Sequence, residues 1–445
     1  MRCRSEKIET GNIRLRYKRN AGIAERSSMA QRRRRRRREK RRRKAGCAAT
    51  LIIVLMLGAG AAYGIPRAAS RFGDQVQETF RETVKKTVNT LQAEDVDFPE
   101  LSVTADEVSD HFYYQQLTDE EQTVYRELLQ GVTDMKECIL IHAGKGERPE
   151  KAYEYLLYDC PELFWCAGSS RMTAYDTYTE FWPEYTCTAG EREKRQDEIQ
   201  AALTECMAGL ETSAGEYDRI RYVYEYLVNT VDYDENAPDN QNIYSALVGK
   251  SSVCAGYSRA AQYLLNNMGI ECIYVVGTAK GQEAHAWNIV NCGGKYYQMD
   301  VTFGDPVFLS SESGENLPGN IIYYDYLCCT DAEILADHIP SDEAAYPACI
   351  SDDLNYYRMN GMYYDSYDPQ ILLGDMNDSI YEGQEMFVCK FSSSEIYQNA
   401  RDAVIEDLFP KAAKTLGTVY GLEQVKYTYI DDETHNKIMV FWNYQ

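Results

Sequence analysis

The chain predicts an α+β fold, and two stretches near its middle carry this prediction. Residues 255–268 place apolar side chains at helical spacing, from Ala260 to Met268, and Gly269 follows as a stop signal. Two strand-like segments then flank Gly293-Gly294, a pair typical of a two-residue hairpin loop. A helix followed by antiparallel strands indicates an α+β domain.

Cys254 lies directly before this helix. The helix dipole and the unpaired backbone N–H groups at a helix N-terminus favour a thiolate. The same N–H groups can face an oxyanion once a carbonyl carbon is attacked. We therefore expect Cys254 to be a candidate thiol nucleophile.

The strands downstream carry an imidazole and a carboxylate. Strands are expected over residues 272–276, 285–291 and 295–302, so His285 and Asp300 lie on opposite arms of the hairpin. Since side chains alternate with period two, a Gly293-Gly294 loop puts both on one face, one step apart diagonally. A loop one residue earlier would put them directly opposite each other.

A thiol, an imidazole and a carboxylate are the three groups that a thiol-nucleophile enzyme uses. The imidazole takes the thiol proton, and the carboxylate fixes the imidazole's tautomer and orientation. The predicted catalytic residues are therefore Cys254, His285 and Asp300.

These residues carry a resemblance to the transglutaminase-like superfamily. The similarity is specific across about residues 216–310 and weaker on both sides. Its segments are Gly249-Lys-Ser-Ser-Val-Cys-Ala-Gly-Tyr257, Gly269-Ile-Glu-Cys-Ile273, His285-Ala-Trp-Asn-Ile-Val290 and Gly294-Lys-Tyr-Tyr-Gln-Met-Asp-Val-Thr-Phe-Gly-Asp-Pro306, with weaker likeness in Tyr113 to Glu121, Asp159 to Trp165, Tyr326 to His338 and Ala348 to Tyr364.

The resemblance implies a papain-like core in which a helix-borne cysteine packs on an antiparallel sheet that carries the histidine and the aspartate. By the resemblance, Cys254 is the nucleophile, His285 the general base and acid, and Asp300 the orienting carboxylate. The weaker segments look like those of bacterial membrane-anchored members. No position of the predicted triad departs from the family pattern.

An apolar segment near the start predicts a membrane span. Residues 45–66 hold no charge, and a helix of 22 residues spans about 33 Å, enough for a bilayer core. The basic run that precedes it, Arg32 to Arg38 and Lys40 to Lys44, is expected to stay cytoplasmic. The sequence thus predicts a single-pass protein of the cell membrane with its catalytic domain outside. A cleaved signal peptide is the alternative.

The charge is divided in the same way. Residues 1–66 hold 20 Lys and Arg against 4 Glu, a net +16, whereas residues 67–445 carry a net −38, giving −22 in total. An acidic exterior disfavours nucleic acid and would attract cationic substrates, although solubility alone also explains it. The expected partners are a protein or peptide substrate, including cell-wall peptides, and the membrane. Nothing predicts the oligomeric state.

The chain has 14 cysteines, of which Cys3 and Cys47 precede or lie in the predicted span. If Cys254 is free, an odd number remains outside, so at least one further thiol would be unpaired. Free thiols outside a cell suggest a low-oxygen environment. Thiol titration of the unreduced ectodomain tests this hypothesis, and ten or more oxidised cysteines would contradict it. No cofactor is expected, because no zinc cluster or calcium loop is recognisable.

The predicted organisation has six parts. They are a basic tail (1–44), the membrane helix (45–66), a stalk and acidic linker (67–110), a mostly helical region (111–215), the catalytic core (216–349) and a C-terminal strand–helix–hairpin region forming a small appended α/β domain (350–445). A capping box at Thr118 and Glu121 is expected to begin the first helix of the fourth part.

Three functions remain open. Water could resolve a thioester on Cys254, giving a peptidase or amidase, or an amine could resolve it, giving a cross-link. Alternatively, the domain could be a non-catalytic surface binding module. Hydrolysis is favoured over cross-linking, because no calcium-ligand loop like those of cross-linking members is recognisable. The non-catalytic alternative would need a broken triad, and this one is intact. For the second oxyanion donor, Gln241, Asn242 and Tyr244 are candidates.

Overall fold

The computed structural model describes residues 96–279, 283–305 and 321–444. These residues belong to one compact unit, residues 89–445. Across the described ranges, no helix is both long and apolar enough to cross a membrane. The span predicted at residues 45–66, the basic tail and the stalk lie outside the described residues.

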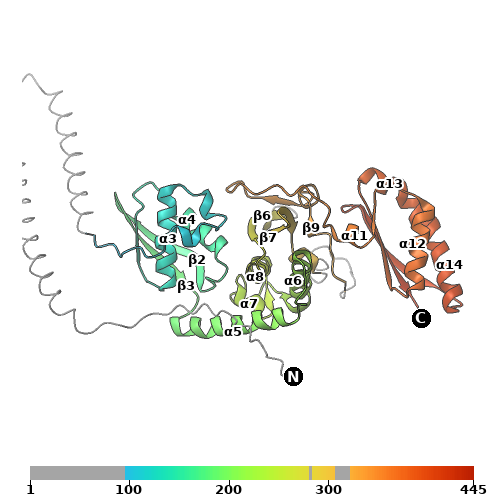
Figure 1. Ribbon diagram of the computed structural model, residues 1–445, viewed down its shortest axis with the longest axis horizontal. Coiled ribbons are helices and arrows are strands. Elements are labelled where there is room, and N and C mark those ends of the chain that lie inside the picture. The colour runs from blue at the N-terminus through green and yellow to red at the C-terminus, as the bar shows by residue number, and fades with distance from the viewer. Residues whose placement is uncertain (1–95, 280–282, 306–320, 445) are drawn as a thin grey trace, which may run out of the picture. The chain divides into compact units, whose positions relative to one another are not determined.

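The N-terminal part of this unit combines helices with a small sheet (Figure 1). The predicted capping box is confirmed, since Thr118 and Glu121 cap each other's backbone at the start of α3. The prediction of a mostly helical region missed a three-stranded antiparallel sheet of order β1-β3-β2. The elements are α3 (Asp119–Thr133), β1 (Ile139–Ile141), α4 (Pro149–Asp159), β2 (Cys166–Ala174), β3 (Thr179–Tyr185) and α5 (Ala189–Ala208).

The central part is a five-stranded antiparallel sheet of order β10-β6-β7-β8-β9 with α8 packed beside β6 and β7 (Figure 1). The predicted helix and strands are all present here. The elements are α6 (Glu216–Thr230), β4 (Asp232–Tyr233), α7 (Ile243–Leu247), β5 (Ser251–Ser252), α8 (Cys254–Asn267), β6 (Cys272–Ala279), β7 (Glu283–Cys292), β8 (Lys295–Met299), β9 (Leu327–Cys329), α10 (Asp331–Ile334) and β10 (His338–Pro340).

The hairpin register matches the first of the two predicted registers. Cys292 pairs with Lys295 and Asn288 with Met299, so Gly293 and Gly294 form the loop, both with positive φ. The return strand is shorter than predicted, because β8 ends at Met299. Asp300 therefore follows the strand, and Thr302–Gly304 form a 3₁₀ turn instead of strand.

The C-terminal part is a four-stranded sheet of order β11-β12-β14-β13. One of its faces packs on α12 and α14, and the other contacts Tyr323 and Tyr357. Since it belongs to the same compact unit as the core, a separate appended domain is not supported, and we call it the C-terminal region. Its elements are α11 (Tyr356–Met359), β11 (Tyr363–Tyr364), α12 (Pro369–Tyr381), β12 (Met386–Phe391), α13 (Ser394–Ala403), a π-helical turn (Val404–Leu408), α14 (Phe409–Tyr420), β13 (Lys426–Asp432) and β14 (Lys437–Asn443).

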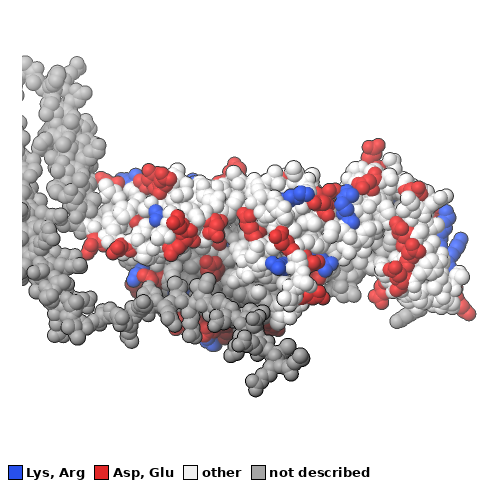
Figure 2. Space-filling view, viewed as in Figure 1, with Lys and Arg blue, Asp and Glu red and all other residues white. Residues whose placement is uncertain are grey.

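The surface is acidic, as the charge division indicates. Figure 2 shows carboxylate groups spread over the visible face of the described residues, with basic groups scattered among them and no basic patch on that face. The twelve cysteines of the described residues are all free thiols, and eight of them are buried. None of them forms a disulfide within these ranges.

Candidate active site

The predicted nucleophile is the first residue of α8. Val253 before it is extended, and its carbonyl accepts the N–H groups of Gly256 (2.9 Å) and Tyr257 (3.1 Å). The N–H groups of Cys254 and Ala255 precede these first intrahelical bonds and can therefore face a bound oxygen atom. Cys254 itself is partly exposed.

A close approach of backbone at Gly256 fixes this helix start. A β-carbon there would lie 1.8 Å from Ser252 Oγ and 3.1 Å from the carbonyl oxygen of Asn240. The Ser252 hydroxyl is buried and lies 2.7 Å from that same oxygen and 2.9 Å from Ser245 Oγ. The glycine thus lets the first turn of α8 sit directly on a buried polar cluster.

We expect Gly256→Ala to destabilise the protein by about 2–4 kcal/mol, because the methyl group must displace Ser252 from its buried hydrogen bonds. Gly374→Ala, in α12, is the matched control, since nothing lies within 4 Å of a β-carbon there. It should leave stability unchanged or slightly raised. Urea unfolding of both variants measures the difference, and equal midpoints would contradict this account.

Hydrogen bonds between α8 and β7 fix the position of the nucleophile along the strand that carries the predicted base. Ser258, one turn after Cys254, places its hydroxyl 2.8 Å from the carbonyl of Ala286 and 2.9 Å from that of Cys254. Asn288 donates its amide to the Ser258 carbonyl at 3.0 Å. Cys254 is thereby held beside His285, which precedes Ala286.

The imidazole and the carboxylate are in direct contact. His285 Nε2 lies 2.7 Å from Asp300 Oδ2, and their side chains are 6% and 0% exposed. Asp300 Oδ1 accepts the backbone N–H groups of Thr302 (2.9 Å) and Phe303 (3.2 Å). Nδ1 is the ring nitrogen that remains for the thiol, and interaction with Cys254 is one of the causes that raise the pKa of His285. The structure thus brings the three predicted residues together.

The electrostatics favour a charged imidazole. Burial alone lowers the pKa of His285, but the negative charge of Asp300 and the hydrogen bonds with Asp300 and Cys254 raise that pKa to about 10. Burial opposes ionisation of Asp300 as well, yet the two imidazoles that contact it hold the pKa of its carboxyl well below the usual range. At neutral pH the pair is therefore imidazolium and carboxylate.

A second histidine contacts Asp300, and the sequence did not predict it. His338 Nε2 lies 3.0 Å from Asp300 Oδ2, and its ring is fully buried at the start of β10. The sequence signals at His338 are weak: it is one of five histidines, it directly follows the acidic Asp337, and it ends a segment of weak family likeness.

The candidates for a second oxyanion donor are reduced to one. The side chain of Asn242 caps α7 and gives its N–H to Asp239, and the Tyr244 hydroxyl bonds Glu198 on α5, so both are engaged elsewhere. Gln241 is exposed and lines a cleft of about 360 Å³ together with Arg259. Its role as a donor stays a prediction.

Two clusters hold groups that bind metals in other proteins, although the sequence predicted no metal. His285, Asp300 and His338 form the first, and Asp325, Asp432 and His435 the second. In the first, a separation of 2.7 Å between Nε2 and Oδ2 is a hydrogen-bond length, shorter than the roughly 3.3 Å between ligands of a tetrahedral zinc ion. In the second, the ammonium group of Lys437 already pairs with both carboxylates.

Comparison with known proteins shows which family this chain resembles. The model of the transglutaminase-like superfamily matches residues 201–301. Kyphoscoliosis peptidase of Mus musculus is 22% identical over 162 residues, covering 33% of this chain and only 24% of that protein. Among solved structures, a TGase has 16% identity and a TM-score of 0.23, covering 30% of this chain and 44% of its own. Menin has 12% identity and a TM-score of 0.25, covering 68% and 66%.

The family match encloses the helix start, the hairpin and all three predicted catalytic residues. Residues 201–301 of this chain therefore form a transglutaminase-like domain.

Proposed function

We propose that the protein is a thiol enzyme that acts on peptide or carboxamide bonds through a thioester, with Cys254 as nucleophile, His285 as base and acid, and Asp300 as the orienting carboxylate. The observation that carries this proposal is the hydrogen bond of His285 Nε2 to the fully buried Asp300, with Cys254 among the groups that raise the pKa of His285. A histidine so held has a fixed orientation, and its other nitrogen, Nδ1, remains for the thiol.

The reaction follows from these positions. The sulfur of Cys254 attacks the carbonyl carbon, while the N–H groups at the start of α8 stabilise the oxygen as it becomes negative. The imidazolium of His285 gives its proton to the leaving amine, and the carbon–nitrogen bond breaks. The neutral imidazole then takes a proton from water, which attacks the thioester and releases the acid and the Cys254 thiolate, so the imidazolium is restored.

Hydrolysis is the resolution that we favour over amine transfer, because no calcium-ligand loop like that of cross-linking members is recognisable in the sequence. The acidic surface suits cationic substrates, such as Lys-rich peptides or amine-bearing wall peptides. The test is mass spectrometry of wall material and surface proteins incubated with purified residues 67–445. Shortened peptides support hydrolysis, new amide cross-links would replace it with transfer, and unchanged material would favour a binding module.

We also propose that residues 45–66 anchor the protein in the cell membrane with the site outside. The support is the uncharged 22-residue segment and the basic run before it. A membrane-impermeant thiol reagent applied to intact cells should label Cys254, with the Cys254→Ala chain as the control. Labelling only after lysis would contradict an outside location.

The raised pKa of His285 gives a pH prediction. Acylation needs the imidazolium as acid, so kcat/KM should fall on the alkaline side near pH 10, where His285 loses its proton, and not near the ordinary value of 6.5. In Asp300→Asn, the fall in the residual rate should move to lower pH, because the negative charge that retains the proton is lost. If the wild-type kcat/KM already decreased on the alkaline side at a pH lower than 8, the proposed ion pair would be contradicted.

A further inference from the structure

The carboxylate of Asp300 lies between two imidazole rings. His285 Nε2 (2.7 Å) and His338 Nε2 (3.0 Å) both contact Oδ2, while Oδ1 is occupied by two backbone N–H groups. The two rings come from β7 and β10, on either side of β6 in the sheet. Four donors thus hold one carboxylate that has no exposed surface.

The second ring is held from its other side as well. His338 Nδ1 lies 2.5 Å from Asp337 Oδ1, so both ring nitrogens face carboxylates, which accept hydrogen bonds and donate none. The ring must donate from both nitrogens and is therefore an imidazolium. Charges then alternate from Asp337 through His338 and Asp300 to His285. The hydrogen bonds to the two carboxylates raise the pKa of His338, although burial opposes this.

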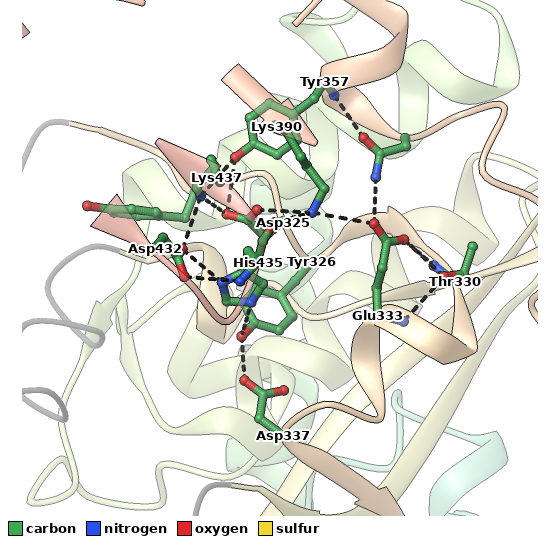
Figure 3. A network of polar contacts seen from close by, with 12 residues as sticks. Asp325, Tyr326, Thr330, Glu333, Asp337, Tyr357, Lys390, Asp432, His435 and Lys437 are labelled. Atoms are coloured by element: carbon green, nitrogen blue, oxygen red, sulfur yellow. Dashed lines mark hydrogen bonds and ion pairs between the residues drawn. The ribbon is translucent and has the colours of Figure 1, made fainter. Parts of the chain in front are cut away.

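The remaining oxygen of Asp337 connects this row to the C-terminal region. Tyr326 donates its hydroxyl to Asp337 Oδ2 at 2.6 Å, so the phenol oxygen is left to accept from His435 Nε2 at 3.0 Å. Figure 3 shows His435, in the turn between β13 and β14, pointing at this phenol, with Asp432 on its other side.

A buried ion pair fastens the same turn to the core. Lys437, fully buried on β14, pairs with Asp325, the residue before Tyr326 (Figure 3). Lys390 of β12 approaches Asp325 at 3.6 Å and Glu333 at 3.4 Å. Removing one partner of such a buried pair is strongly destabilising, so the turn that carries His435 has a fixed position against Tyr326.

We propose that His338 is a positioning residue for the triad, and that the C-terminal region holds it in place through His435 and Tyr326. This inference rests on the proposed function, because it assigns a role relative to Asp300. With its second donor, Asp300 Oδ2 is held from two sides, and this fixes the oxygen that orients His285 through Nε2. The His338 cation also balances the charge of the buried Asp300 carboxylate beside His285.

The test uses alkylation of Cys254 by iodoacetamide across pH, which needs no substrate. The variants are His338→Gln, Tyr326→Phe and His435→Gln. His142→Gln is the matched control, because that ring is 54% exposed and contacts Glu127, away from the site. The titratable groups that face His338 are Asp300, Asp337, His285 and Tyr326, and all but Tyr326 are kept in every variant.

For His338→Gln we expect the midpoint of alkylation to rise by about one pH unit, because a buried cation beside the Asp300–His285 pair is lost, so alkylation below the midpoint slows about tenfold. Turnover should fall about 10- to 100-fold, as for other groups that orient a catalytic ligand. Tyr326→Phe and His435→Gln should shift the midpoint less and in the same direction, and His142→Gln should not shift it.

If His338→Gln had the same pH midpoint of alkylation as the wild-type protein, the inference would be overturned. If that variant does not fold, by its thermal unfolding curve, Tyr326→Phe and His435→Gln decide: a shift supports the proposal and an unchanged midpoint in both overturns it. A wild-type protein whose Cys254 is not alkylated faster than a free thiol at pH 7 would instead contradict the proposed function. The two failures are therefore distinguishable.

Discussion

Cys254→Ala is expected to abolish turnover and to remove the fast phase of thiol alkylation at neutral pH, while the protein unfolds at nearly the same temperature. The sulfur is the only protein atom in the proposed reaction that forms a bond to the substrate carbon, and alanine keeps the helix start intact. Because Cys254 is partly exposed, removing its sulfur leaves no large cavity. Rates should drop by four or more orders of magnitude, about the loss seen when a nucleophile is deleted.

The control is Cys138→Ala, at another partly exposed cysteine that lies outside the site. It should keep full activity and the fast alkylation phase. Alkylation is measured by mass spectrometry of the intact chain and turnover by peptide release. Residual turnover of more than about one per cent in Cys254→Ala would contradict the role given to its sulfur.

Asp300→Asn is expected to lose activity by about 10⁴-fold, because the amide would hold the wrong tautomer of His285. The sequence alone suggests that such a change leaves folding near normal, but the structure indicates otherwise. Both His285 and His338 direct N–H groups at the same oxygen, and neither ring has exposed surface of more than a few per cent. Losing the anion between them should cost about 3–5 kcal/mol of stability.

Asp134→Asn serves as the control, since that carboxylate is 55% exposed and pairs only with Lys136 at 3.5 Å. Its unfolding free energy should change by less than about 0.5 kcal/mol. Denaturant unfolding gives stability and single-turnover kinetics gives the acylation rate. If Asp300→Asn were as stable as Asp134→Asn, the paired-imidazole arrangement would be wrong.

The parts of the site joined by local signals could be predicted from the sequence. Gly293-Gly294 fixes the hairpin register, and period-two alternation then places His285 near Asp300. Gly269 ends α8 with positive φ, as expected of a stop signal. These signals act within about 50 residues, and each depends on a backbone requirement that few residues satisfy.

The parts that depend on long-range pairing could not be predicted. His338 reaches Asp300 because β10 pairs with β6 at the edge of the sheet, a pairing that no periodicity in the sequence indicates. The small sheet of the N-terminal part was missed because most side chains of β2 are exposed and few are apolar. Asn242 and Tyr244 are candidates by sequence distance, yet Asn242 caps α7 and Tyr244 donates its hydroxyl to Glu198.

Lys437 pairs with Asp325, and His435 contacts Tyr326. These contacts determine where a recombinant fragment can end. A fragment trimmed to the matched boundaries, residues 201–301, would contain every atom of the predicted triad but none of the backbone donors at residues 302 and 303, nor His338. Asp300 would then be the second-last residue of the fragment. The smallest piece that keeps this aspartate enclosed extends to the last strand, and trimming from the carboxyl end removes its outermost support first.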